Sequence, residues 1–140
     1  MIYNLPANNL YGDLPVTIDF PDNWEIHVSE INGYNKKPME CTELKKAMDQ
    51  PVGVPTIKEG AKNKKSAVII IDDITRPTPC KEIAEIVIDE LLEAGVAKEN
   101  IWFIAALGGH GPMVREDFIR KLGEDIVDTF EIYNHNVFYN

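Results

Sequence analysis

A run of five residues, Ala67 to Ile71, constrains the fold of this chain more than any other feature. The run is apolar, rich in β-branched side chains, and shows no alternation with polar residues. Such a run predicts a central strand of a parallel sheet that is covered on both faces. A second apolar run, residues 101–106 (IWFIAA), follows after a segment with helical periodicity. The succession of strand, helix and strand predicts a right-handed βαβ unit.

The segment between the two runs carries the signals of an amphipathic helix. Thr78 and Pro79 are typical of an N-cap and a first helical residue, and Gly95 is typical of a stop after Ala94. The apolar stripe expected to face the sheet consists of Ile83, Ile86, Val87 and Leu91. Shorter helices are predicted at 43–48, with Thr42 as N-cap, from about residue 55, and over about 114–122, where Gly123 ends the helix. A last strand is expected over 131–136.

The amino-terminal part predicts a β-hairpin. Residues 16–20 and 24–28 alternate between apolar and polar side chains on either side of a Pro-Asp-Asn turn. His27 falls on the polar face of the second run, so we expect it at the surface. Together these patterns predict one α/β domain over residues 1–140, a Rossmann-like three-layer domain with a mainly parallel sheet and an N-terminal β-hairpin.

Composition narrows the classes of partner. Lys and Arg total 14 against 23 Asp and Glu, and this net charge of −9 argues against binding of nucleic acid through a broad basic face. Cys41 and Cys80 form no CxxC pattern, which suits a reducing compartment. The sequence has neither a signal-peptide pattern nor an apolar run of ~18 residues, so we expect a cytoplasmic protein without membrane association. The three histidines lack metal-ligand spacing, so no metal held by protein side chains is expected.

Polar residues follow the first apolar strand at once, in the segment DDITRPTP (72–79). Loops at the carboxyl ends of neighbouring parallel strands converge on one crevice, where ligands bind. Arg76, held by a stiff proline-containing backbone, can bind a carboxylate or phosphate with two parallel hydrogen bonds. The alternative interpretation is that Asp73 and Arg76 only pair with each other and that the prolines shape a turn.

The second strand leads into a glycine-rich loop, LGGHGPM (107–113). Glycines around His110 let the backbone approach a ligand closely and expose amides that suit an anion. A histidine, with an unperturbed pKa of ~6.5, can transfer protons in both directions near neutral pH, so His110 is a candidate acid or base. The alternative is a histidine that is only hydrogen-bonded within its loop. His135, flanked by Asn134 and Asn136, lies either at the same crevice or at the sheet edge.

Three segments of this chain resemble the amino-terminal domain of the nickel-dependent lactate racemase family. They are DDITRPTP, ALGGHGPM and KLGEDIVDTFEIYNHN, and the upstream ELKKAMDQPVG fits the same family's helix and NPIG-like turn. The resemblance covers roughly residues 40 to 136. It implies an isomerase, a racemase or epimerase that acts on a lactate-like 2-hydroxy acid with the help of a nickel-pincer nucleotide.

In that family the substrate's α-hydrogen leaves as hydride to the cofactor, while a histidine takes the hydroxyl proton. The resemblance therefore implies catalytic His110, a cofactor site with Asp73, Thr75 and Arg76, and substrate contacts from Arg76, Gly108 and Gly109. The sequence departs from the family at Gly111, where lactate racemases have an arginine. The loss of this anion contact leaves a larger or differently charged 2-hydroxy acid as compatible as lactate.

Family members are also much longer, and their cofactor-anchoring lysine, second catalytic histidine and nickel-ligating histidine lie beyond the matched region. We therefore expect residues 1–140 to be the N-terminal fragment of a two-domain enzyme, inactive alone, with the C-terminal domain as its partner and as the main holder of the cofactor. Two other hypotheses remain. One is a non-catalytic module that binds an organic anion or a nucleotide phosphate; the other is phosphoryl chemistry at Asp72 or Asp73, although no DxDxT motif is present.

Overall fold

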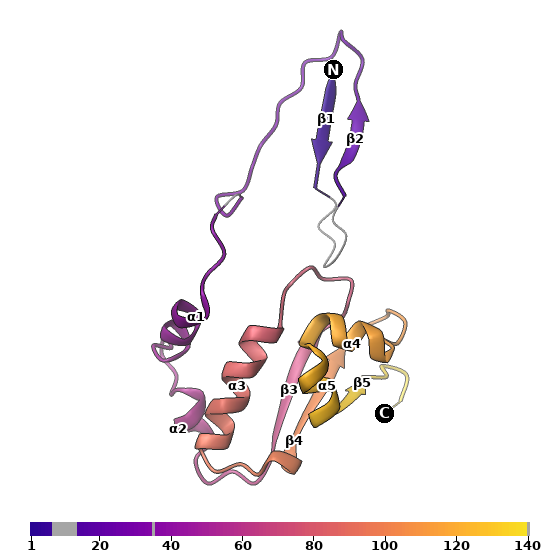
Figure 1. The fold of residues 1–140 in the computed structure, drawn as a ribbon. Helices are drawn as coiled ribbons and strands as arrows, with labels where there is room; N and C mark the ends of the chain where they lie inside the picture. The colour runs from indigo at the N-terminus through magenta and orange to yellow at the C-terminus, as the bar shows by residue number, and fades with distance from the viewer. Residues whose placement is uncertain (7–13, 35, 140) are drawn as a thin grey trace.

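The structure is a computed structural model that describes residues 1–6, 14–34 and 36–139. The elements in chain order are β1 (Ile2–Leu5), β2 (Val16–Asp19), α1 (Cys41–Met48), α2 (Ile57–Ala61), β3 (Ala67–Asp72), α3 (Lys81–Glu93), a 3-10 helix (Lys98–Asn100), β4 (Ile101–Ala106), α4 (Arg115–Leu122), α5 (Glu124–Thr129) and β5 (Glu131–Asn134). Figure 1 shows a helix-and-sheet unit with a two-stranded hairpin standing away from it. Within the described ranges, none of the helices has the length and apolar character needed to cross a membrane.

A three-stranded parallel sheet in the order β3-β4-β5 forms the centre of the α/β unit. The strands β3 and β4 pair in register from Ala67 opposite Ile101 to Asp72 opposite Ala106. Helix α3 connects these two strands, so the predicted strand–helix–strand unit is present. The α/β class, the parallel sheet and an N-terminal hairpin are confirmed.

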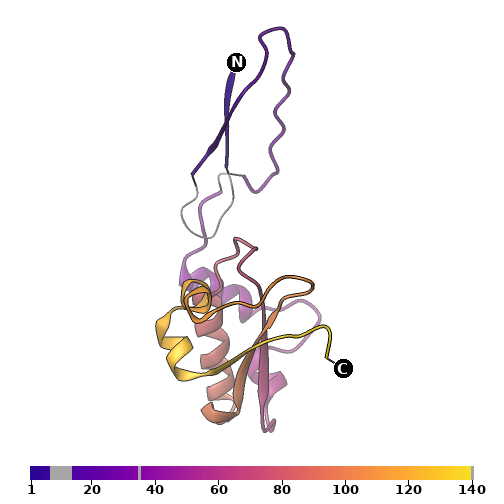
Figure 2. The same ribbon diagram turned by 90° about the vertical axis from the view of Figure 1, so that its right-hand side faces the viewer.

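The helices cover one face of this sheet. The main core joins side chains of β3 and β4 to those of α3, α4 and α5, and its buried members are Ile71, Ala84, Ile88, Phe103, Ala105, Leu107, Met113, Phe118, Leu122 and Ile126. Successive strand side chains point to opposite faces, and on the other face Val68 and Ile70 remain 49% and 70% exposed. The expectation of a central strand covered on both faces at residues 67–71 is therefore wrong for the described residues. The strand β3 lies at one edge of the described sheet, and α3, α4 and α5 pack on the same side of it, as Figure 2 shows.

Helix α3 presents the predicted Leu91 and, partly buried, Val87 to the core, but the rest of its buried stripe differs from the prediction. Its buried residues are Ala84, Ile88 and Leu91, whereas Ile83 is 40% exposed. The small side chain of Ala84 lets the helix lie close to the sheet, and Ile83 turns toward Leu44 of α1, with which it lines a surface hollow. The helix begins after an N-cap at Cys80, two residues later than the predicted N-cap.

The segment after α4 contains a helix that the sequence patterns missed. Gly123 ends α4 with φ +86°, a backbone conformation that favours glycine, and α5 begins directly after it. The predicted stop at Gly123 is confirmed, but the chain continues as a helix to Thr129 before β5. The strand β5 ends at Asn134, so the predicted strand over 131–136 is two residues too long.

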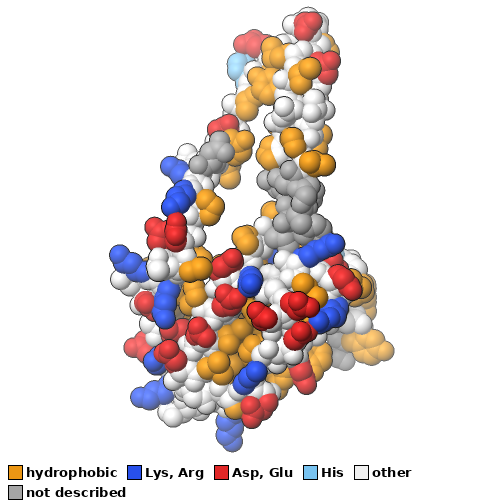
Figure 3. Space-filling model, in the orientation of Figure 1, with side chains coloured by type: hydrophobic (Ala, Val, Ile, Leu, Met, Phe, Trp, Pro, Cys, Tyr) orange, Lys and Arg blue, Asp and Glu red, His pale blue; other side chains and the backbone are white. Residues whose placement is uncertain are grey.

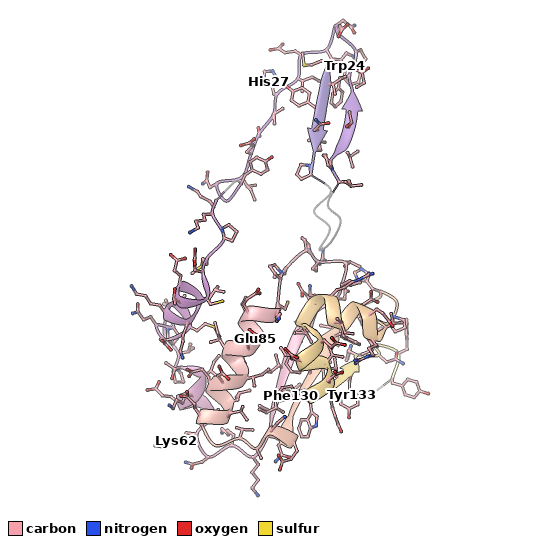
Figure 4. All side chains as sticks on the ribbon, viewed as in Figure 1. Trp24, His27, Lys62, Glu85, Phe130 and Tyr133 are labelled. Carbon is pink, nitrogen blue, oxygen red and sulfur yellow. The ribbon has the colours of Figure 1, made fainter. Side chains whose placement is uncertain are left out.

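The hairpin has a different second strand from the one predicted. The strand β2 pairs antiparallel with β1, from Ile2 opposite Asp19 to Leu5 opposite Val16, and residues 24–28 form no strand. The ring of Phe20 lies between those of Tyr3 and Trp24, with centroid distances of 6.2 and 6.1 Å. Figure 4 shows Trp24 and His27 at the end of the hairpin remote from the α/β unit. His27 is exposed, as expected, and lies away from the sheet edge where the loops meet.

Acidic and basic side chains are interspersed on the face drawn in Figure 3, over α3, α4 and α5. Two of the ion pairs on these helices are Arg115 with Asp128 at 2.6 Å and Lys81 with Glu85 at 3.9 Å. Exposed pairs of this kind contribute little to stability, because solvent screens them. The fold therefore depends mainly on the apolar core between these helices and the sheet.

The position of the core predicts that substitutions on the two faces of the sheet change the free energy of unfolding by very different amounts. We expect Phe103→Ala to lower the free energy of unfolding by about 3 to 5 kcal/mol, because the fully buried ring would leave a cavity. The matched substitution Ile70→Ala, on the open face, should change it by only about 0.5 kcal/mol. Urea denaturation followed by circular dichroism measures both values. A large loss at Ile70 would show that something covers the open face in solution.

Candidate active site

The two polar loops predicted from the sequence meet at one edge of the sheet. The strands β3 and β4 end side by side, at Asp72 and Ala106, and each continues directly into its loop. His110, from the second loop, places Nδ1 2.5 Å from Oδ2 of Asp73 in the first. The structure thus joins the two candidate side chains that the sequence singled out on separate segments.

Asp73 is buried, and both of its carboxylate oxygens accept hydrogen bonds. Only 4% of the residue is exposed, and its Oδ1 accepts hydrogen bonds from the backbone N–H of Thr75 at 2.8 Å and from the Thr75 hydroxyl at 2.5 Å. Burial alone would raise the pKa of Asp73, but the hydrogen bonds from Thr75 and His110 outweigh burial and lower its pKa to about 2. Asp73 is therefore ionised at every pH near neutrality.

The ionised carboxylate of Asp73 determines which ring nitrogen of His110 carries a proton. An ionised carboxylate only accepts hydrogen bonds, so Nδ1 of His110 must carry the proton that lies between the two groups. In neutral His110 this leaves Nε2 without a proton, as in the aspartate–histidine pairs of hydrolases. The His110 side chain is 49% exposed, so Nε2 is accessible to a ligand. The arrangement can accept a proton at Nε2 and stabilise the resulting imidazolium.

Behind this pair lies an ion pair that the sequence patterns did not identify. The ammonium of Lys121, on α4, is 2.6 Å from Oδ1 of Asp72, and the Lys121 side chain is fully buried. Burial raises the pKa of Asp72, but the hydrogen bonds from Lys121, Thr78 and Cys80 and the charge of Lys121 together outweigh burial, so the net pKa is lowered. Burial also raises the pKa of the neighbouring Cys80 thiol to about 11, which keeps that thiol protonated. A sequence signal did exist, since Lys121 follows Phe118 by three residues and so shares its inward face of the helix.

The second loop is held by an amide at the end of β5. The side chain of Asn134 accepts a hydrogen bond from the N–H of Met113 at 3.0 Å and donates one to the Met113 carbonyl at 2.9 Å. The next residue, His135, donates its backbone N–H to the carbonyl of Ala105 at 3.0 Å. The Asn134 bonds attach the end of the glycine-rich loop to β5, and the His135 bond holds the end of β5 against β4.

A cavity of about 330 Å³ opens beside His110. Its walls come from the glycine-rich loop and from the segment after β5, and they consist of Leu107, Gly108, His110, Pro112, Asn134, His135, Asn136, Val137 and Phe138. Of the two positions left open for His135, the crevice and the sheet edge, the structure therefore favours the crevice. Gly109 and Arg76, two of the three predicted substrate contacts, do not line this cavity.

Arg76 lies at the surface of the first loop. Its guanidinium forms neither an ion pair nor a hydrogen bond with any residue that the structure describes, while its backbone N–H donates to the carbonyl of Asp73 at 3.1 Å. The alternative in which Asp73 and Arg76 only pair with each other is therefore wrong, because Thr75 and His110 occupy the carboxylate. The free guanidinium suits a phosphate or carboxylate.

The residues present fit a nucleotide cofactor only in part. Thr75 and Arg76 are exposed and can contact a phosphate, but the oxygens of Asp73 are already bonded within the protein. Among the described residues there is no group of three or more His, Cys, Asp or Glu side chains able to hold a metal ion. Protein ligands for a nickel ion would have to come from elsewhere.

This geometry defines a class: an α/β domain with a carboxylate–imidazole pair at the carboxyl edge of a parallel sheet, beside a cavity. A sequence profile of the lactate racemase N-terminal domain matches residues 11–139. The chain belongs to the lactate racemase N-terminal domain family.

Individual relatives agree with this assignment. The lactate racemase of Lactiplantibacillus plantarum is 37% identical over 109 residues, which cover 77% of this chain and 25% of the relative. The lactate racemase of Thermoanaerobacterium thermosaccharolyticum is 28% identical over 128 residues, covering 90% and 30%. The solved structure of its apoprotein matches 97% of this chain and 30% of that chain, with a TM-score of 0.67 and 26% identity. The chain thus spans between a quarter and a third of the length of these relatives.

The low pKa of Asp73 predicts a specific loss of stability in acid. Its folded pKa of about 2 lies below the ordinary value of 3.8, so Asp73 contributes stability that is present above pH 4 and is lost as the pH falls toward 2. At about 1.4 kcal/mol per pKa unit this contribution is roughly 2 kcal/mol. Urea unfolding between pH 6 and pH 2 should show a smaller pH-dependent loss in Asp73→Asn than in the natural chain. Equal slopes in the two proteins would contradict the assignment.

Proposed function

We propose that this chain is the substrate- and cofactor-facing N-terminal domain of a racemase or epimerase that acts on a 2-hydroxy acid. The observation that carries the proposal is the hydrogen bond between Asp73 and His110 at the edge of the cavity. The family assignment supports this reaction class, since both curated relatives are named lactate racemase.

In the proposed reaction His110 takes the hydroxyl proton of the substrate at Nε2. Asp73 keeps Nδ1 protonated and stabilises the charge that the ring gains, so it acts through His110. Gly108 lines the cavity and lets the backbone come close to the substrate. Arg76, whose guanidinium has no partner in the part of the chain that the structure describes, would bind the carboxylate of the substrate or a phosphate of the cofactor, and Gly109 would contact the substrate once the site is complete.

When bound, the nickel-pincer nucleotide would supply the acceptor for the α-hydrogen. Thr75 and Arg76 would contact it from the first loop, and Asp73 would support that loop without touching the nucleotide. The main anchors and the nickel ligands would lie in a C-terminal partner domain that corresponds to the rest of the longer relatives. A domain that only binds an organic anion or a nucleotide phosphate is the alternative function.

Chiral chromatography of 2-hydroxy acids tests the proposal. The complete gene product, produced with the cofactor-building enzymes and supplied with nickel, should interconvert the two enantiomers of at least one acid in a panel that includes lactate. Turnover should require the cofactor. Loading of the cofactor without turnover of any 2-hydroxy acid would reject the proposed reaction, and binding of an organic anion without loading would favour the alternative function.

Substitution of the candidate base gives a sharper prediction. His110→Ala should lower kcat by about 100- to 10,000-fold, the range for loss of a general acid or base, and leave cofactor loading unchanged. His27→Ala is the matched control, because His27 is exposed and remote from the sheet edge, and it should retain full activity. A fully active His110→Ala enzyme would disprove the catalytic assignment.

Gly111, next to the base, is proposed to set the size or charge of the accepted acid. A Cβ atom added at this position would meet no atom within 4 Å beyond its chain neighbours, and the backbone there is not in the left-handed region that favours glycine. Gly111→Arg should therefore fold normally and add an anion contact, which shifts the ratio of kcat/KM between lactate and larger acids toward lactate by about tenfold or more. Gly33→Arg, which also has open space, is the control. An unchanged ratio of kcat/KM between the acids would show that Gly111 does not determine substrate specificity.

A further inference from the structure

The strongest unexplained feature is the buried ammonium of Lys121. The residue is 1% exposed and lies in the last turn of α4, the helix that directly follows the glycine-rich loop. Its Nζ contacts Oδ1 of Asp72 at 2.6 Å and donates hydrogen bonds to the carbonyls of Asp73 at 3.2 Å and Arg76 at 3.0 Å. An ammonium has three N–H donors, so these three acceptors use its full capacity.

All three acceptors belong to the first loop and its preceding strand end. The carbonyl of Asp73 accepts from Lys121 and also from the N–H of Arg76, which closes the turn that carries Thr75. Lys121 thus holds the backbone of the turn whose N–H and hydroxyl bind the Asp73 carboxylate. Because its own helix follows the loop of His110, one side chain connects the two halves of the acid–base pair.

Stability alone does not explain this arrangement. Moving the ammonium of Lys121 fully out of water, and the Asp72 carboxylate partly, opposes folding, and apolar side chains of similar volume often stabilise a fold equally well or better. The position of Lys121 beside Phe118 and Leu122 in the core would suit an apolar residue. The ammonium of Lys121 makes directional hydrogen bonds to particular backbone carbonyls, which an apolar side chain cannot do.

We propose that Lys121 is a positioning residue that holds the 72–76 turn against α4 and thereby keeps the Asp73 carboxylate on the His110 ring. The proposal rests on the proposed function for its effect on turnover, but not for its effect on His110 itself. Lys121 is not among the residues that line the cavity, and its partners are the Asp72 carboxylate and the carbonyls of Asp73 and Arg76, so it acts through the turn and not on a ligand.

The test measures the His110 ring directly, by NMR of the 140-residue chain labelled with ¹⁵N-histidine, with His110→Ala to assign the signals. In the natural chain the ring nitrogens should report a proton on Nδ1. In Lys121→Met, a variant of similar length without the charge, we expect the mixture of tautomers that is typical of a free imidazole. The matched control is Lys58→Met, which removes an exposed lysine 2.7 Å from Glu93 and should leave the His110 signals unchanged.

A second variant tests the proposal if Lys121→Met alone fails to fold. Lys121→Met leaves the half-buried Asp72 without its partner, so the double variant Asp72→Asn with Lys121→Met removes both charges and should retain the circular dichroism spectrum of the fold. It still lacks the donor to the two carbonyls, and we expect the same loss of the Nδ1 tautomer. A folded variant of either kind with unchanged His110 signals would overturn the proposal.

Turnover of the complete gene product separates this proposal from the proposed function. Lys121→Met should lower kcat on the order of 100-fold with little change in KM, as expected when a catalytic group is misplaced rather than lost. A changed His110 tautomer together with an active His110→Ala enzyme would support the positioning role and reject the catalytic role of His110. Unchanged kcat in Lys121→Met, with His110→Ala inactive, would overturn the positioning role.

Discussion

The in-register parallel pairing of β3 with β4 determines where everything else in the site lies. Asp72 is level with Ala106, so the two strands pass into their loops at the same height of the sheet. A shift of one residue would turn Asp73 to the opposite face and move it away from His110. The register itself is fixed by burial, since Ile71, Phe103 and Ala105 must all face the helices. The apolar core thus positions the polar pair.

Two adjacent carboxylates at the end of one strand would repel each other if they shared an environment. The fold separates them, because Asp72 pairs with the ammonium of Lys121 and Asp73 with Thr75 and His110. Each carboxylate therefore has its own compensating donors, and the pKa of each is lowered despite burial. In a chain with a net charge of −9, a buried lysine at this point has a local role that the overall charge does not suggest.

The sequence predicted the features that depend on local pattern and missed those that depend on partners from elsewhere. The apolar runs, the stop at Gly123 and the convergence of the loops with Asp73 and His110 follow from periodicity and strand order. Residues 24–28 alternate like a strand, but pairing requires a second strand, and residues 2–5 take that place beside β2. The roles of Lys121 and Asn134 depend on backbone atoms of residues 73, 76 and 113, which no local pattern identifies.

In the proposed reaction the side chains of this chain can carry out only one of the two transfers, that of the hydroxyl proton. If His110 takes the hydroxyl proton of a 2-hydroxy acid, the oxygen's electron pair forms the carbonyl and the α-hydrogen must leave with the electrons of its C–H bond. Amino-acid side chains do not accept hydride, so the proposed reaction would depend on a cofactor to receive it. The Asp73–His110 pair is accordingly suited to one half of the reaction, the movement of the hydroxyl proton. In the proposed function the cavity beside His110 would take the substrate, and the guanidinium of Arg76, which has no partner among the described residues, would contact the substrate or the cofactor.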